Sequence, residues 1–222
     1  MSTDLERNPA QRDDGAEARV VRGLMPPHLV LHEFLEKETL AALLEFTLAH
    51  ESAFAPSALG FDEGKINPEI RVSTGTRDFG QFKPILISKI LPLVPHMVGK
   101  LRTTPVRAPG LELELVAHNQ GAFYKRHIDT QTASDRKSLR VLSGVYYFHA
   151  VPKAFTGGEL RLYAIGAENA PFVDIAPERN SLLVFPSWAP HEVRPISCSS
   201  GRFIDSRFAI NCWVHRSNSD KT

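Results

Sequence analysis

The sequence has few cysteines, almost no net charge and no long uninterrupted apolar run. Cys198 and Cys212 are the only cysteines among 222 residues, and two cysteines do not make a disulfide framework. We expect both to be reduced, as is usual inside cells. The formal net charge of +1 gives no general attraction to nucleic acid or to anionic membranes. The longest apolar stretch, about residues 84–98, contains Lys89, His96 and three prolines, so we expect no membrane span.

The N-terminal residues lack the apolar core of a secretion signal. Residues 1–19 are polar and include several acidic side chains, so the cytoplasm is the expected location. We expect residues 1–18 to form a flexible tail. The hydrophobic content of 42% over 222 residues is enough to bury a full core. We therefore expect residues 19–222 to form a single domain.

The first half of the chain predicts two helices. Leucines recur at helical spacing within residues 35–50. Residues 81–102 show a second helical pattern, which Pro92 and Pro95 should kink or end. Residues 52–79 lie between the two helices and have no clear periodicity. So long a segment without a pattern is typical of a functional lid or a mobile loop.

From Leu111 onward the apolar period changes to two, which is typical of strands with one buried face. Glycines and prolines separate the later strand-like runs, which cover residues 122–127, 139–149, 159–163, 173–175, 181–185, 192–196 and 206–215. About eight strands after two helices predict a mainly β, α+β fold. We expect a double-stranded β-helix, or jelly roll, over about residues 111–216, with the helices packed on one sheet.

A His-x-Asp pair within residues 124–129 is the first candidate for chemistry. On an extended strand His127 and Asp129 project to the same side. Two ligands hold a metal poorly, and His191, at the start of a later strand-like run, is a candidate third. Two histidines and one carboxylate on one face are the ligand set of non-haem Fe(II) oxygenases.

Five segments, taken in order, resemble the catalytic core of the prolyl 4-hydroxylase-like branch of the Fe(II)/2-oxoglutarate-dependent oxygenases. The resemblance covers Leu113–Trp213. The segments are Tyr124–Asp129 (YKRHID), Gly144–Tyr147 (GVYY), Gly157–Leu162 (GGELRL), His191–Pro195 (HEVRP) and Arg207–Trp213 (RFAINCW). A single segment of this kind would be a weak signal, whereas five in family order are a strong one.

The resemblance implies Fe(II) and 2-oxoglutarate as cofactors, with ascorbate as a further one. It implies His127, Asp129 and His191 as iron ligands. It also implies that Arg207 pairs with the distal carboxylate of 2-oxoglutarate, which suits a guanidinium fork. Tyr147 matches a tyrosine that binds the same carboxylate.

Two positions depart from the family pattern. His118 stands where relatives often have a tyrosine that lines the co-substrate pocket. Residues 197–206 form a longer loop than the nearest pattern, so Arg202 lies at the spacing that some relatives use for their basic residue. The apolar sequence after Arg207 favours Arg207, with Arg202 as the alternative.

The resemblance implies a dioxygenase that hydroxylates an unactivated C–H bond. A prolyl residue of a peptide or protein is the first substrate expected, and a free amino acid or small metabolite the alternative.

Candidate pocket residues are Arg71, Arg140 and Trp213. Five basic residues make this region locally basic: Lys125, Arg126, Arg136, Lys137 and Arg140. Such a patch usually indicates a solvated face, and the alternative is a site for a polar or acidic substrate. A non-catalytic jelly-roll sensor of a metal or a small acid stays open, as does the oligomeric state; we expect no nucleic-acid or membrane partner.

Overall fold

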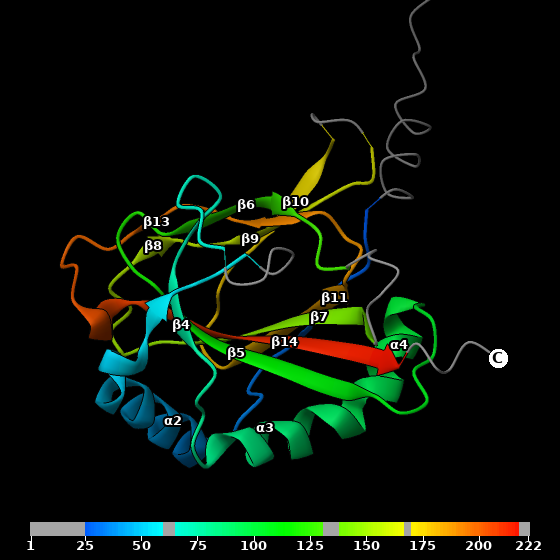
Figure 1. Cartoon of the computed structure of the whole chain (residues 1–222), viewed down its shortest axis with the longest axis horizontal. Helices are drawn as coiled ribbons and strands as arrows, with labels where there is room; N and C mark the ends of the chain where they lie inside the picture. The colour runs from blue at the N-terminus through cyan, green and yellow to red at the C-terminus, as the bar shows by residue number, and fades with distance from the viewer. Residues whose placement is uncertain (1–24, 60–64, 131–137, 167–169, 218–222) are drawn as a thin grey trace, which may run out of the picture.

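The computed structural model describes residues 25–59, 65–130, 138–166 and 170–217. The tail expected over residues 1–18 lies outside these ranges. In the described residues two β-sheets face each other, and helices cover the outer side of the larger sheet (Figure 1). The mainly β jelly-roll prediction, with N-terminal helices on one sheet, is therefore confirmed.

The larger sheet has seven strands in the order β1-β11-β7-β14-β5-β4-β2, and the smaller has five in the order β10-β9-β12-β6-β3. The strands of the larger sheet are β1 Leu29–Leu31, β2 Ala55–Pro56, β4 Thr74–Thr76, β5 Gly110–His118, β7 Ser138–Phe148, β11 Ser181–Pro186 and β14 Arg207–Ser217. Those of the smaller are β3 Arg71–Val72, β6 Phe123–His127, β9 Leu160–Tyr163, β10 Phe172–Ile175 and β12 His191–Val193. A two-stranded ribbon joins β8 Thr156–Gly157 to β13 Ile196–Ser197.

The two predicted helical regions are confirmed. The first is α2, Lys37–Ala49, and it is followed by the 3₁₀ turn Glu51–Ala53. The second is broken at its prolines, as expected, into α3 Phe82–Ile90, a 3₁₀ turn Leu91–Leu93 and α4 Val94–Leu101. By length and composition alone, residues 82–101 are also apolar enough to cross a membrane, which the sequence reasoning did not expect.

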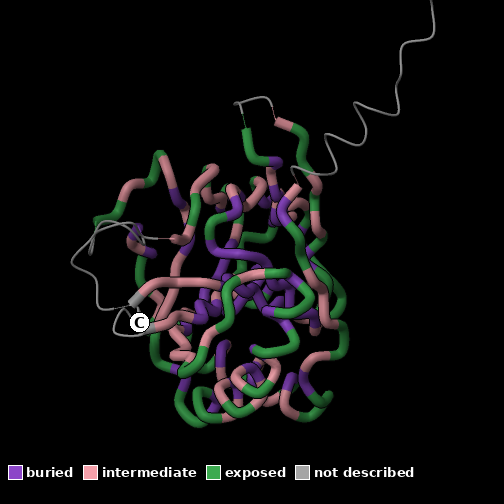
Figure 2. Tube along the Cα trace, turned by 90° about the vertical axis from the view of Figure 1, so that its right-hand side faces the viewer, coloured by how far each residue is buried: buried purple, intermediate pink, exposed green. Residues whose placement is uncertain are grey.

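The apolar faces of these helices and the outer side of the larger sheet form the main core. Leu86 and Met97, from α3 and α4, are buried there against Ile210 of β14. Figure 2 shows buried residues in the middle of the molecule, with exposed ones around them. Burying a side chain of this size contributes about 1.5–3 kcal/mol, so this face fixes the larger sheet.

The opposite side of the larger sheet carries the polar residues that matter for function. In β14, Phe208 and Ile210 belong to the main core, whereas Arg207, Asn211 and Trp213 line the cavity between the sheets. Side chains alternate between the two faces of a strand. One long strand therefore serves both the core and the cavity.

The segment over residues 52–79 is partly regular, which the sequence did not indicate. It contributes β2 and β4 to the larger sheet and β3 to the smaller one. These strands have two or three residues each, too few to show a period of two. Residues 60–64 lie outside the described ranges, so a lid there stays a prediction.

Truncating the main core should destabilise the whole domain. We expect Leu86→Ala to lower the free energy of unfolding by about 2–5 kcal/mol, because it removes a buried side chain and leaves a cavity. In urea denaturation the change appears as a lower urea concentration at the midpoint of unfolding, with an unchanged m-value. Ile165→Ala, at an exposed position, is the control and should stay within about 0.5 kcal/mol of the parent. Equal effects of the two substitutions would contradict the assigned core.

Candidate metal centre and co-substrate pocket

Strand pairing brings the three predicted ligands together. His127 ends β6 and His191 begins β12, and these two residues are direct partners in the antiparallel pair. Asp129 follows two residues after His127, and its backbone N–H donates to the carbonyl oxygen of Ser187 at 2.9 Å. The chain therefore converges on one point from two segments about 60 residues apart.

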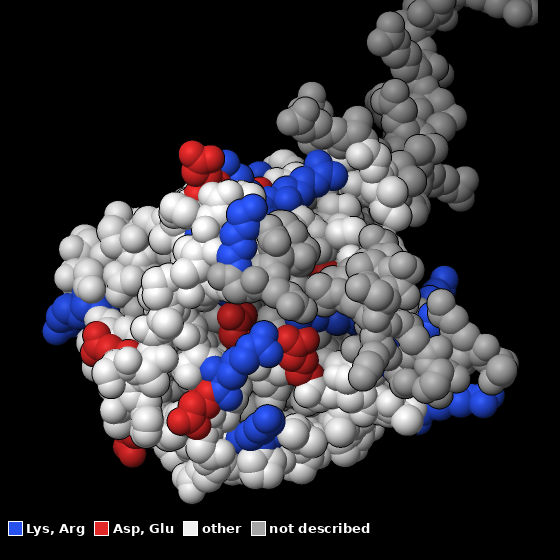
Figure 3. Space-filling view, in the orientation of Figure 1, with Lys and Arg blue, Asp and Glu red and all other residues white. Residues whose placement is uncertain are grey.

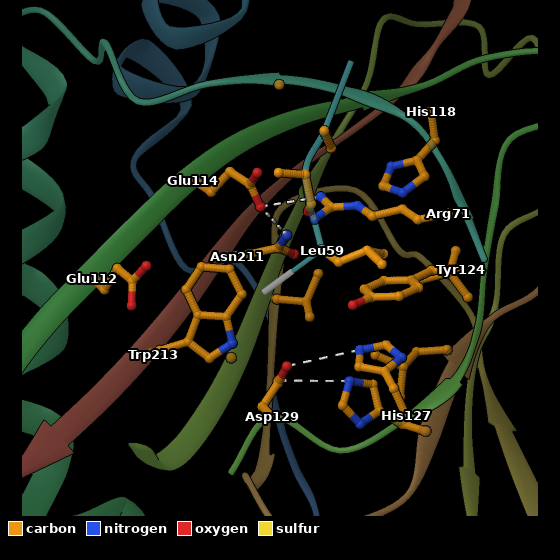
Figure 4. A pocket seen from close by; sticks show the side chains of 18 of the residues that line it. Leu59, Arg71, Glu112, Glu114, His118, Tyr124, His127, Asp129, Asn211 and Trp213 are labelled. Atoms are coloured by element: carbon orange, nitrogen blue, oxygen red, sulfur yellow. Dashed lines mark hydrogen bonds and ion pairs between the residues drawn. The ribbon is translucent and has the colours of Figure 1, made fainter. Parts of the chain in front are cut away.

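The ligand atoms of the three side chains all lie within 4.8 Å of one another. The distance from His127 Nε2 to Asp129 Oδ1 is 3.8 Å, and that from His191 Nε2 to Asp129 Oδ2 is 3.6 Å (Figure 4). This spacing suits one small divalent cation that binds all three groups. Two histidines and one carboxylate are also the ligand set of the facial metal sites that leave positions open for other ligands.

Hydrogen bonds to the backbone orient both imidazoles. Nδ1 of His127 lies 2.7 Å from the carbonyl oxygen of Lys125, and Nδ1 of His191 lies 2.9 Å from that of Ala189. A carbonyl only accepts, so each ring carries its proton on Nδ1 when neutral. The lone pair of each Nε2 then faces Asp129 and is available to a metal.

The protonation states also suit a metal. Burial, together with the nearby His191, lowers the pKa of His127 to about 3. Burial alone would raise the pKa of Asp129, but His191, His127 and the Ser143 hydroxyl outweigh it and hold that pKa below its usual range. At neutral pH the centre therefore holds a neutral His127 imidazole and a carboxylate, which are the ligand forms that bind metals.

A pair of buried serines holds the carboxylate of Asp129. The Ser143 hydroxyl donates to Asp129 Oδ2 at 2.6 Å and lies 2.9 Å from the hydroxyl of Ser187. The indole N–H of Trp213 is a further donor that lowers the pKa of Asp129. One side of the carboxylate is thus fixed by the protein, so its orientation is set before a metal arrives.

Deeper in the same cavity lies a buried guanidinium without an anionic partner. Arg207 is 1% exposed, and its Nε and NH2 have no hydrogen-bond partner among the described residues. The hydroxyl of Tyr147 is buried and equally unpartnered there, and the Arg207 guanidinium lies 4.7 Å from the Tyr147 ring centroid. Leaving such groups unpaired is costly, so this end of the cavity is suited to a carboxylate.

His118 supports Arg207 from the side. Its Nδ1 lies 3.2 Å from Arg207 NH1. Burial, followed by the charge of Arg207, keeps the pKa of His118 well below its usual range, so the ring is neutral and accepts this hydrogen bond. Gly158 has a positive φ of 75°, and a Cβ there would lie 2.7 Å from Arg207 Cδ. A glycine is therefore needed for the guanidinium to reach its place.

The structure places Arg202 away from this site. Its side chain is 69% exposed, and its Nε donates to Asp205 at 2.7 Å. Arg207 opens β14 and lines the cavity. Of the two candidate arginines, Arg207 is thus the one that lies within reach of a ligand.

The cavity has a volume of about 670 Å³, and all three predicted substrate residues line it. Arg71 is fully engaged in holding the wall: it donates to Ser73, to the carbonyl oxygen of Ala58 and to Glu114. Arg140 and Trp213 lie against each other in the wall, with the guanidinium 4.0 Å from the centroid of the indole.

Sequence reasoning missed several residues of the cavity. Glu112 and Glu114 alternate with leucines in β5 and line the cavity instead of facing bulk solvent. Their alternation predicted a strand, but it gave no sign that a second sheet would cover the polar face. Asn211, which donates to Glu114, and Ser143 gave no pattern either.

The residues present fit the two cofactors that the resemblance implies. Two imidazoles and a carboxylate on one face suit Fe(II). The unpaired Nε and NH2 of Arg207 and the Tyr147 hydroxyl suit the distal carboxylate of 2-oxoglutarate. Both sets open into the same cavity.

Curated relatives match the C-terminal part of the chain. A PKHD-type hydroxylase of Synechocystis sp., itself named as uncharacterised, is 37% identical over 138 residues, which cover 60% of this chain and 45% of that protein. Human Egl nine homolog 1 is 29% identical over 134 residues, covering 58% of this chain and 28% of that protein. The chain thus spans less than half the length of these two relatives.

Solved structures share the fold. A prolyl-4-hydroxylase from Pseudomonas putida superposes with a TM-score of 0.63 at 24% identity, covering 90% of this chain and 99% of that one. A prolyl hydroxylase from Trichoplax adhaerens, in complex with a peptide of the hypoxia inducible factor oxygen degradation domain, has a TM-score of 0.62 at 21% identity, covering 92% and 93% of the two chains.

The sequence match to a family coincides with the region that holds the site. The model of the 2OG-Fe(II) oxygenase superfamily matches residues 113–215. This range begins in β5, ends in β14 and includes the three clustered ligands and Arg207. Residues 113–215, which hold the site, therefore match a 2OG-Fe(II) oxygenase domain.

Proposed function

We propose that the protein is an Fe(II)- and 2-oxoglutarate-dependent dioxygenase that hydroxylates an unactivated C–H bond. The observation that carries the proposal is the pairing, in one cavity, of a three-residue metal-binding group with a buried guanidinium that lacks an anion. Either feature alone is compatible with a binding protein. Together, the metal-binding group offers a site for the chelating end of 2-oxoglutarate, and the guanidinium offers one for its distal carboxylate.

A prolyl residue of a peptide or protein is the first substrate proposed. The Trichoplax prolyl hydroxylase is described in complex with a peptide, and the Pseudomonas protein is named as a prolyl-4-hydroxylase. The alternative is a free amino acid or a small metabolite, which a cavity of about 670 Å³ also accommodates.

When bound, iron and 2-oxoglutarate supply the oxidative chemistry, in which decarboxylation to succinate and carbon dioxide accompanies insertion of one oxygen atom into the substrate. The role of this chain is to hold and orient. His127, Asp129 and His191 would hold the metal, and Arg207 with Tyr147 would hold the distal carboxylate. Val145, Leu160 and Phe185 line the same cavity, and their apolar side chains would exclude water and so strengthen both sets of contacts.

The direct test is 2-oxoglutarate turnover by purified protein. Incubation with Fe(II), 2-oxoglutarate and oxygen should release succinate even without substrate, because many enzymes of this type turn over slowly when uncoupled. A peptide or metabolite pool should then show a 2-oxoglutarate-dependent mass gain of one oxygen atom. Chelation of the metal should abolish both signals, and parallel reactions with and without ascorbate test whether it is a further cofactor. Absence of succinate in the metal-loaded protein would favour a binding module.

Arginine substitutions should separate the two candidate co-substrate residues. We expect Arg207→Ala to weaken 2-oxoglutarate binding by about 3 kcal/mol or more, because the buried carboxylate loses its charged partner. Arg202→Ala is the matched control and should change affinity little, since Arg202 is exposed and paired with Asp205. Calorimetric titration of the Zn(II)-loaded protein with 2-oxoglutarate measures the affinity of both variants. A larger loss of affinity in Arg202→Ala than in Arg207→Ala would show that Arg207, at the start of β14, is not the residue that binds 2-oxoglutarate.

Removing the hydroxyl that orients the metal carboxylate should weaken metal binding. We expect Ser143→Ala to lower metal affinity by roughly 10–100-fold, because Asp129 loses its 2.6 Å donor. Ser143→Thr keeps the hydroxyl and should retain most of the affinity. Titration with Co(II), followed by its visible absorption, measures both variants without any need for activity. Equal affinity of Ser143→Ala and the parent would exclude a positioning role.

A further inference from the structure

Between the metal ligands and solvent, one carboxylate is clasped by two guanidinium groups. Glu112 accepts from Nε and NH2 of Arg140 at 3.2 and 2.7 Å, and from NH2 of Arg77 at 3.0 Å. All three side chains line the cavity. They come from different segments: Glu112 from β5, Arg140 from β7 and Arg77 from the residue after β4. We call Arg77, Glu112 and Arg140 the mouth cluster.

The mouth cluster carries an excess of positive charge. The neighbouring arginines outweigh burial and lower the pKa of Glu112, so at neutral pH one carboxylate faces two guanidiniums. The other charged pair of the wall, Arg71 with Glu114, is balanced at 3.1 Å. Figure 3 shows basic and acidic side chains gathered near the middle of this face, over the space between the sheets.

Both arginines keep donors for a ligand. Among the described residues, NH1 of Arg140 and the Nε and NH1 of Arg77 have no hydrogen-bond partner. The Arg140 side chain is only 11% exposed and lies flat against Trp213, 4.0 Å from the ring centroid. Its orientation is therefore fixed in advance, which lowers the entropic cost of binding. Guanidinium groups held in this way suit a carboxylate.

The mouth cluster lies next to the metal centre. Trp213 contacts Arg140 on one side and donates its indole N–H toward Asp129 on the other, and Figure 4 shows the indole between Glu112 and Asp129. An anionic group held by Arg140 would therefore lie on the other side of the Trp213 indole from Asp129. A substrate bound at the metal centre can bring such a group to the arginines only on a part of the molecule close to that centre.

We propose that Arg77 and Arg140 form a subsite for a carboxylate of the substrate, adjacent to the hydroxylated carbon. This rests on the proposed oxygenase function and narrows its substrate class to molecules with a free carboxylate near the target carbon. The carboxylate has two sources: the α-carboxylate of a free amino acid, or an Asp or Glu side chain that neighbours the target residue in a peptide. Glu112 positions the two guanidiniums, and their excess positive charge disfavours substrates with a cationic group at this point.

The test compares probes that differ in one carboxylate. L-Proline and L-prolinamide form the free amino acid pair, and the blocked peptides acetyl-Gly-Asp-Pro-Gly-amide and acetyl-Gly-Asn-Pro-Gly-amide form the second pair. Binding to protein loaded with redox-inert Zn(II) and 2-oxoglutarate is measured by calorimetry. In each pair the acidic member carries a carboxylate where the neutral member carries an uncharged amide. We expect the carboxylate member of one pair to bind roughly tenfold more tightly than its amide partner, as one charge-assisted contact allows. The pair that shows the preference identifies the source.

Charge-neutralising variants locate the preference. Arg140→Gln and Arg77→Gln should each reduce the acidic-to-neutral affinity ratio toward one, while 2-oxoglutarate affinity stays as in the parent. Arg77 is largely exposed, so Arg77→Gln keeps the test valid if Arg140→Gln fails to fold. Arg161→Gln removes the same charge outside the cavity, where Arg161 pairs with Asp174, and should leave the ratio unchanged.

The outcomes separate this inference from the proposed function. An unchanged ratio in both mouth variants, a preference for the neutral members, or no binding of either acidic probe at millimolar concentration overturns the carboxylate subsite. Succinate release by the iron-loaded protein is measured separately. Release without any charge preference defeats the subsite alone, whereas charge-selective binding without succinate defeats the oxygenase proposal and leaves an acid-binding site.

Discussion

The antiparallel pairing of β6 with β12 is the constraint on which the site depends. It sets His191 directly opposite His127, and no side-chain contact needs to do so. A shift of one residue in this pairing would turn one imidazole to the other face of the sheet. Neighbouring bonds secure the pairing: Asp129 N and Thr130 N both donate to the Ser187 carbonyl, and Ser187 N donates to that of Val141. The segment before β12 is thereby tied to both sheets.

The two faces of the larger sheet contribute to the free energy of folding with opposite sign. Its outer face, against α2, α3 and α4, is apolar and supplies stability. Its inner face holds Arg207, Tyr147 and the glutamates, whose burial costs free energy unless each finds a partner. Glu112 and Glu114 have found theirs within the chain, but Nε and NH2 of Arg207 have none among the described residues. The stability of the outer face thus compensates for an inner face on which Arg207 needs a ligand as its hydrogen-bond partner.

Sequence reasoning reached the fold through repeating patterns, and the full set of metal-binding residues through the resemblance to the oxygenase family. Alternation marked β5, an apolar run marked β14, and prolines marked the break between α3 and α4. The spacing of His127 and Asp129 marked a shared face. What it missed depends on contacts between distant segments. Ser143 stands among apolar residues of β7, and only the fold brings its hydroxyl to Asp129.

The glutamates of β5 show the same limit. An alternating strand usually turns its polar side to water, and nothing in the local sequence shows that the smaller sheet will cover Glu112 and Glu114. The short strands β3 and β4 were missed because two or three residues carry no period. Their effect is nevertheless large, since Arg71 on β3 fixes the cavity wall through Glu114.

The inner end and the mouth of the cavity differ in how strongly their charges hold an anion. At the inner end, the buried Arg207 has no counter-charge bonded to it among the described residues, so an anion there gains the full benefit of a desolvated contact. At the mouth, Glu112 offsets part of the charge of Arg77 and Arg140, and Arg77 is largely exposed, so an anion there gains less and is screened more. A molecule with two carboxylates therefore finds its stronger site deep in the cavity, and one that fills the mouth is released more readily. The charges therefore grade the affinity for an anion along the cavity, from strong at the buried Arg207 to weak at the exposed Arg77.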